Sequence, residues 1–93
     1  MNKDDREEII KSLGRKGALK ILDLLAEKKE MSFNEIARNV GYAVTANRVL
    51  KEFVKLGIVK KKEMKDKLGT VIYVLTENGL NINSLLVQMR MWE

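Results

Sequence analysis

Residues 44–75 constrain the fold of this chain more than any other stretch, because a helical pattern is followed there by a glycine and two β-like runs. Apolar residues recur at helical spacing in the first part: Ala46, Val49, Leu50, Phe53 and Leu56. Gly57 follows at the position where helices commonly end in a left-handed glycine. The pair Ile58-Val59 and the run TVIYVL at 70–75 are rich in the β-branched and aromatic residues typical of strands. The stretch therefore predicts a helix followed by a β-hairpin.

Helical patterns account for most of the remaining chain, over 4–13, 15–28, 33–40 and 77–92. Ser32 and Glu35 match a capping box that opens the third of these helices, and Met31 before it is placed as a very short strand. Thr76 is the predicted N-cap of the last helix. Two helices joined by a short glycine-containing turn are typical of helix-turn-helix proteins. We expect an α+β, mostly α fold: a winged helix-turn-helix with a three-helix core, a β-hairpin wing, and N- and C-terminal dimerisation helices.

The length of 93 residues is suited to one small domain. Within it, 1–14 form the N-terminal helix, 15–76 the winged-helix core and 77–93 the C-terminal dimerisation helix. The helix that contains the apolar pattern described above is expected over about 43–56. Its start is placed between Tyr42 and Thr45, and Thr45 is an acceptable N-cap.

Two residue types are absent, and their absence excludes several kinds of site. The chain has no cysteine and no histidine. Disulfides, thiolate ligands and cysteine nucleophiles are excluded, together with the commonest general base. No pair of carboxylates lies in an apolar context that would raise a pKa, and the acidic residues near the N-terminus suit a helix N-terminus. We therefore expect no metal, no cofactor and no enzymatic activity.

No apolar run approaches the length of a membrane span, and the N-terminus has mixed charge without the apolar core of a signal peptide. With no cysteine present, we expect a cytoplasmic, nucleoid-associated protein that does not contact a membrane.

The positive charge of the chain is concentrated in the predicted hairpin. The net charge is +5, and residues 58–70 hold five lysines against two acidic residues. A local basic stripe on a basic domain indicates a polyanionic partner, although a solvated lysine-rich loop would look the same. For a helix-turn-helix protein the expected polyanion is DNA, and Lys65 and Lys67 at the tip of the hairpin are expected to reach its phosphates or its minor groove. Lysines 60–62 cannot all face the DNA, because alternate residues of a strand point to opposite faces.

The polar face of the helix at 43–56 is the predicted recognition surface. Asn47 suits adenine, Arg48 suits guanine, and Thr45 offers a hydroxyl or a methyl group to thymine. Lysines farther along the helix would meet phosphates. Ordinary solvent-facing polar residues are the alternative. The predicted DNA-binding residues are Ser32, Asn34, Tyr42, Thr45, Asn47, Arg48, Lys51, Lys55, Lys62, Lys65 and Lys67.

The last helix has apolar residues on two sides. Ile82, Leu85, Leu86, Met89 and Trp92 fall on one side at helical spacing, and Leu80, Val87 and Met91 fall nearly opposite. A monomer needs one such stripe, so the second predicts a homodimer; a helix buried on both sides within one domain is the alternative. The predicted interface consists of Ile9, Ile10, Leu13, Leu80, Leu85, Leu86, Val87, Met89, Met91 and Trp92.

Three segments carry a family resemblance: SFNEIARNV, ANRVLKEFVKLGIVKKK and VIYVLTENGL. A helix ending in Leu-x-x-Leu-x-x-x-Gly-(Leu/Ile)-Val is matched by Leu50, Phe53, Gly57, Ile58 and Val59, and a closing Tyr-x-Leu-Thr-x-x-Gly by Tyr73, Leu75, Thr76 and Gly79. Over about residues 15–90 the chain resembles prokaryotic winged-helix transcriptional regulators, especially HxlR-like and ArsR-like ones, with an archaeal character. The resemblance implies a dimeric regulator with its recognition helix at about 43–56 and its wing at 60–70.

The same resemblance leaves the effector open. ArsR-like metal sensing uses cysteine and histidine ligands and HxlR-like redox sensing uses thiols, and this chain has neither residue type. A constitutive DNA binder and a regulator that responds to a small molecule or a protein both fit the sequence. Two other functions compete with a sequence-specific regulator: a winged helix used for protein–protein contact, and a non-specific, chromatin-like DNA-binding protein.

Overall fold

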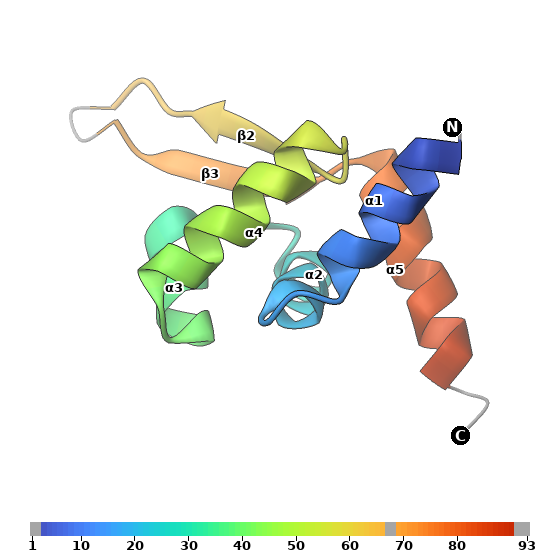
Figure 1. Ribbon diagram of the computed structural model, residues 1–93. Coiled ribbons are helices and arrows are strands. Elements are labelled where there is room, and N and C mark those ends of the chain that lie inside the picture. The colour runs from blue at the N-terminus through green and yellow to red at the C-terminus, as the bar shows by residue number, and fades with distance from the viewer. Residues whose placement is uncertain (1–2, 67–68, 91–93) are drawn as a thin grey trace.

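The computed structural model describes residues 3–66 and 69–90 and has the predicted order of helices and strands (Figure 1). Its elements are α1 (Lys3–Leu13), α2 (Ala18–Lys28), β1 (Glu30–Ser32), α3 (Phe33–Val40), α4 (Ala43–Lys55), β2 (Val59–Glu63), β3 (Val71–Leu75) and α5 (Glu77–Arg90). The β2–β3 hairpin extends from one end of the helical body, whereas α1 and α5 lie at the other end (Figure 1). The predicted mostly helical winged helix-turn-helix fold is confirmed.

The start of α2 differs from the prediction, which placed it at residue 15. Gly17 precedes the helix with φ of 85°, in the left-handed region that favours glycine. The Ala18 N–H donates to the Arg15 carbonyl at 3.1 Å, so residues 15–17 form a turn. The predicted helix was therefore three residues too long at its N-terminal end, because residues 15–17 form a turn that is evident only from the backbone conformation.

The boundaries of α3 follow the sequence signals closely. The Ser32 hydroxyl accepts a hydrogen bond from the Glu35 N–H at 3.2 Å, and the Ser32 N–H donates to the Glu35 carboxylate at 3.3 Å. This reciprocal pair is the predicted capping box. Gly41 ends the helix in the left-handed region with φ of 97°. A short turn then leads to α4.

Helix α4 begins at Ala43, with Tyr42 as an N-cap that makes no side-chain capping bond. The start lies within the predicted window from Tyr42 to Thr45, and Thr45 is not the N-cap because it lies inside the first turn. At the other end, the Ile58 N–H donates to the Phe53 carbonyl at 2.8 Å and the Gly57 N–H to the Val54 carbonyl at 3.1 Å. With Gly57 at φ of 74°, these bonds form a Schellman motif. The predicted glycine stop is confirmed.

The sheet has the strand order β1–β3–β2, and both pairings are antiparallel. Tyr73 of β3 lies opposite Met31 on one side and Lys61 on the other. The hydrophobic core is formed chiefly by α2, α3, α4 and the strand ends: Ile9, Ala18, Ile21, Leu22, Leu25, Met31, Ile36, Ala46, Val49, Leu50, Phe53, Ile58, Val59 and Tyr73. The sheet thus holds the hairpin at a fixed position beside α4.

Thr76 and Gly79 join the hairpin to α5. The Thr76 hydroxyl accepts from the Gly79 N–H at 3.1 Å, as expected of an N-cap, and donates to the Gly57 carbonyl at 2.5 Å. Gly79 lies so close to the Ile58 carbonyl that no side-chain carbon would fit there. Among the helices in the described ranges, none has the length and apolar character needed to cross a membrane.

Candidate nucleic-acid interface

The outward face of α4 is polar and accessible. Ala46, Val49, Leu50 and Phe53 are buried against the core, and Asn47, Arg48, Lys51 and Lys55 are exposed on the other side. Thr45 is half-buried. The structure therefore places four of the predicted DNA-binding residues together on the free side of the helix. It adds Val44 in the first turn, which is 73% exposed and was not predicted.

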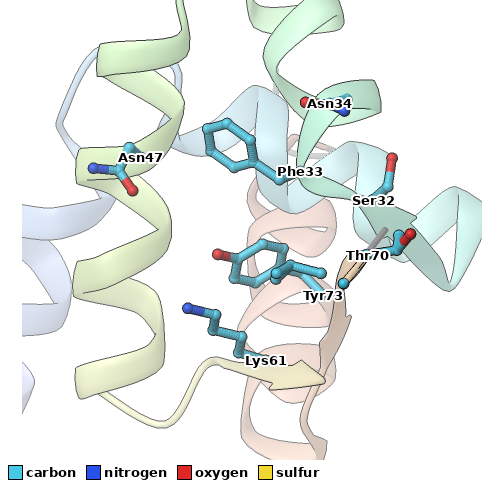
Figure 2. Close-up of a pocket in the computed structure, with 9 residues that line it drawn as sticks. Ser32, Phe33, Asn34, Asn47, Lys61, Thr70 and Tyr73 are labelled. Carbon is cyan, nitrogen blue, oxygen red and sulfur yellow. The ribbon is translucent and has the colours of Figure 1, made fainter. Parts of the chain in front are cut away.

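A groove lies between α3, α4 and the hairpin, with a volume of about 370 Å³. It is lined by Ser32, Phe33, Asn34, Asn47, Lys61, Gly69, Thr70, Val71 and Tyr73. Figure 2 shows the rings of Phe33 and Tyr73 in this space, with the Lys61 side chain beside Tyr73. Ser32, Asn34 and Asn47 were predicted to bind DNA, and the groove brings them together. The remaining residues of the groove were not predicted from the sequence.

The strand register separates the lysines of the wing. Lys61 pairs with Tyr73, which faces the helices, whereas Lys60 pairs with Val74 and Lys62 with Ile72 on the opposite face. Lys61 is therefore on the side that faces α4, and Lys62 is on the other side of the hairpin, so DNA binding by Lys62 stays a prediction. The sequence indicated that successive lysines point to opposite faces of the strand. Which lysine points toward the helices is known only from the strand pairing, which places Lys61 opposite Tyr73. Among the predicted tip lysines, Lys65 is exposed and Lys67 lies outside the described residues.

Tyr73 forms the buried floor of the groove. It is only 6% exposed, and burial raises the pKa of its phenol above the ordinary value. Like any tyrosine phenol, the hydroxyl is protonated at neutral pH and can donate a hydrogen bond. Together with the Lys61 ammonium, it gives the groove donors suited to an anionic oxygen, whereas the Ser32 and Thr70 hydroxyls already donate to the Glu35 and Asp66 carboxylates.

The loop of the wing is organised by Asp66. Its carboxylate accepts from the Thr70 N–H at 3.0 Å and from the Thr70 hydroxyl at 2.7 Å. The Met64 N–H also donates to the Thr70 carbonyl at 2.8 Å, which extends the hairpin pairing beyond β2 and β3. The acidic residue within the basic wing therefore has a structural role, and it leaves Lys65 exposed beside it.

Two further contacts position α4 from its other side. The Glu52 carboxylate lies 2.7 Å from Nε of Arg15 and accepts from the buried Ser12 hydroxyl at 3.2 Å. At the N-terminal end, the Lys16 ammonium lies 5.4 Å from the centroid of the exposed Tyr42 ring, a cation–π arrangement. Tyr42 was predicted to bind DNA, and this contact adds a cation next to it. The end of α1 and the α1–α2 turn thus contact the candidate recognition helix at two points, Glu52 and Tyr42.

The predicted dimer residues divide into two groups. Ile9 is 7% exposed and belongs to the core of its own domain, so its assignment to an interface is wrong. Leu13 and Leu86 are half-buried against that core. The exposed group consists of Ile10, Leu80, Leu85, Val87 and Met89. Met91 and Trp92 lie outside the described residues.

The arrangement of α5 also corrects the predicted stripes. Ile82 and Leu86 pack on the core, whereas Leu85 and Met89, which were placed on the same stripe, are about 60% exposed. The reason is that α5 contacts its domain along a narrow strip, while α1 lies beside it. A hollow of about 300 Å³ between the two helices is lined by Arg6, Ile9, Ile10, Asn78, Asn81, Ile82 and Leu85. Most of this face is apolar and accessible.

Comparison with known proteins identifies the family from the sequence. Residues 12–93 match the model of the HxlR-like helix-turn-helix family. The chain is 36% identical over 74 residues to the uncharacterised protein MJ0944 of Methanocaldococcus jannaschii, covering 76% of this chain and 62% of the relative, which is less than two thirds of its length. It is 32% identical over 82 residues to the uncharacterised HTH-type transcriptional regulator BH0655 of Halalkalibacterium halodurans, covering 86% and 73% of the two chains.

Solved structures agree in fold. The reduced form of the transcriptional regulator YodB from B. subtilis superposes with a TM-score of 0.82 at 24% identity, covering 99% of this chain and 91% of that one. The domain Mb0332 from Mycobacterium bovis, a homodimeric winged helix-turn-helix DNA-binding domain, gives a TM-score of 0.75 at 26% identity, covering 95% and 79%. With the family match over most of its length and the winged fold described above, the chain belongs to the HxlR-like helix-turn-helix family of winged-helix transcriptional regulators.

Proposed function

We propose that the protein is a sequence-specific regulator that binds double-stranded DNA as a homodimer, with α4 in the major groove and the hairpin on phosphate or the minor groove. The observation that carries the proposal is the outward face of α4, whose Asn47, Arg48 and Lys51 are exposed beside a groove that contains Lys61. A helix that reads DNA must keep its outward side free of contacts with its own domain.

The side chains divide by chemistry into two roles. Asn47 pairs with adenine and Arg48 with guanine, since each can form two hydrogen bonds to the major-groove edge of that base. Lys51, Lys55 and the wing lysines bind phosphates, which gives affinity without sequence choice. Lys61 lies between the residues that read bases and those that bind phosphates, because it reaches from the hairpin into the groove beside α4.

The homodimer is supported by the apolar surface of α1 and α5. Ile10, Leu85 and Met89 are each at least 60% exposed, and clustered exposed apolar side chains are typical of interaction sites. Mb0332, a structural neighbour of similar size, is homodimeric. A twofold dimer would present two α4 helices to successive half-sites of DNA.

The proposal includes a cytoplasmic, nucleoid-associated location and no enzymatic activity. The proposal includes no cofactor. Regulation by a small molecule or by a protein remains compatible with it. An archaeal origin stays a prediction from the character of the sequence.

Selection from a random duplex library, followed by fluorescence anisotropy, tests the proposal. We expect one enriched sequence to bind far more tightly than a shuffled duplex, and affinity to fall steeply between about 50 and about 200 mM salt. Arg48→Ala should lose about 1–3 kcal/mol on the selected duplex while its binding to the shuffled duplex changes less. Lys28→Ala at the end of α2, outside α4 and the groove, is the matched charge-removal control. Absence of binding at low salt would overturn the proposal.

A further inference from the structure

Val44 is an exposed aliphatic residue that was not among the residues predicted to bind DNA. It is the second residue of α4, and its 73% exposure is the highest among the exposed large hydrophobic side chains of the described residues. It adds nothing to the core, and valine is a poorer helix former than alanine. Single exposed apolar residues are common, so the exposure alone does not assign a role. The neighbours of Val44 on the helix carry the argument.

Val44 lies within the polar outward face of α4. Arg48 and Lys51 follow it at i+4 and i+7, and Asn47 at i+3, so the four side chains share one side of the helix. The buried stripe of Ala46 and its apolar partners faces the other way. Val44 is thus one aliphatic group among side chains suited to bases and phosphates, rather than part of an apolar patch. It also stands at the N-terminal end, whose residues reach base edges in a major-groove helix.

The chemistry of the major groove restricts what such a side chain can recognise. An isopropyl group has no donor or acceptor, so it binds neither phosphate nor the polar edge of a base. The apolar group that the major groove offers is the 5-methyl group of thymine. We propose that Val44 determines specificity by contacting a thymine 5-methyl group in each half-site, an inference that rests on the DNA-binding function proposed above.

A double substitution in protein and DNA tests this contact. Each thymine of the selected operator is replaced in turn by deoxyuridine, which lacks the methyl group, and anisotropy gives the affinity of the wild type and of Val44→Ala. At one thymine of a half-site we expect deoxyuridine to weaken the wild type about fourfold. Val44→Ala loses the contact in both half-sites, so it should bind the thymine duplex about as weakly as the wild type binds a duplex with deoxyuridine at that position of both half-sites, with no further loss on deoxyuridine.

Val54→Ala is the matched control, because it makes the same change on the same helix at its C-terminal end, where the side chain is 40% exposed. It should keep the full difference between thymine and deoxyuridine. Val44→Ala removes only exposed atoms and introduces a better helix former, so circular dichroism should report an unchanged fold.

The outcomes separate this inference from the proposed function. An operator without thymine, or an equal deoxyuridine effect in the wild type and Val44→Ala at every thymine, would overturn the role of Val44 while leaving sequence-specific binding in place. A library in which no sequence is enriched would overturn both.

Discussion

At the scale of single residues, the interface depends on which side of the hairpin each lysine occupies. Lys61 shares a face with Tyr73 and lines the groove beside α4, whereas Lys60 lies on the opposite face. We predict that Lys61→Ala weakens binding to selected and shuffled duplexes by a similar factor and lowers the slope of log affinity against log salt by about 1. The measurement is a salt titration by anisotropy.

Lys60→Ala is the control for this prediction, because it removes the same charge one residue away. Its effect on the salt slope should be clearly smaller than that of Lys61→Ala. Equal effects of the two substitutions would mean that the hairpin approaches DNA with its other face, and our orientation of the wing would be wrong.

Tyr73 gives a prediction for the alkaline range. Burial raises the pKa of its phenol in the folded state above about 10, the value of an unperturbed tyrosine. The unfolded chain therefore releases this proton at lower pH than the native chain, and the stability contribution of the neutral phenol is lost as the pH rises from about 10 through the native pKa. Denaturant unfolding at several pH values should show a smaller alkaline loss of stability in Tyr73→Phe than in the wild type. Identical slopes would contradict the assignment.

At the scale of elements, the approach of α5 to the hairpin depends on Gly79. A Cβ there would overlap the Ile58 carbonyl, a backbone atom that cannot move without displacing the start of β2. We predict that Gly79→Ala lowers the free energy of unfolding by about 1–3 kcal/mol. Denaturant unfolding measures the change, and Gly14→Ala is its control.

The control differs because an added Cβ at Gly14 would meet its nearest atom, the Lys11 carbonyl oxygen, at 3.5 Å, an ordinary contact. Gly14→Ala should leave stability nearly unchanged. If both variants were equally stable, α5 would pack on the hairpin more loosely than described.

At the scale of the whole molecule, the proposed dimer interface is the exposed apolar face of α1 and α5. Leu85→Asp places a charge on this face, where the native side chain is 60% exposed, so the monomer should still fold while the dimer dissociates. Analytical ultracentrifugation at micromolar concentration should report a dimer for the wild type and a monomer for the variant. Leu19→Asp changes a leucine of α2 that is 50% exposed and should remain dimeric. A monomeric wild type would contradict the prediction.

The sequence predicted the elements well because their signals are local. The Ser32 capping box and the Gly57 stop depend on residues within one turn, and the structure confirms both. The direction of a side chain depends on partners far along the chain. The side of the hairpin on which Lys61 lies could not be predicted because it is set by pairing with Tyr73, and the burial of Ile9 could not be predicted because it depends on the packing of α1 against the core. The helices were therefore predictable, and the composition of the interface was only partly so.

Footprinting of the selected operator tests the central claim, that two copies of α4 read successive half-sites, most directly. Hydroxyl-radical cleavage of the duplex saturated with wild-type protein should show two protected segments related by twofold symmetry, with centres one helical turn of about 10 base pairs, or a whole multiple of it, apart. Arg48→Ala should lose this pattern at concentrations where the wild type is saturated. A single protected segment, or protection spread evenly along the duplex, would contradict the account.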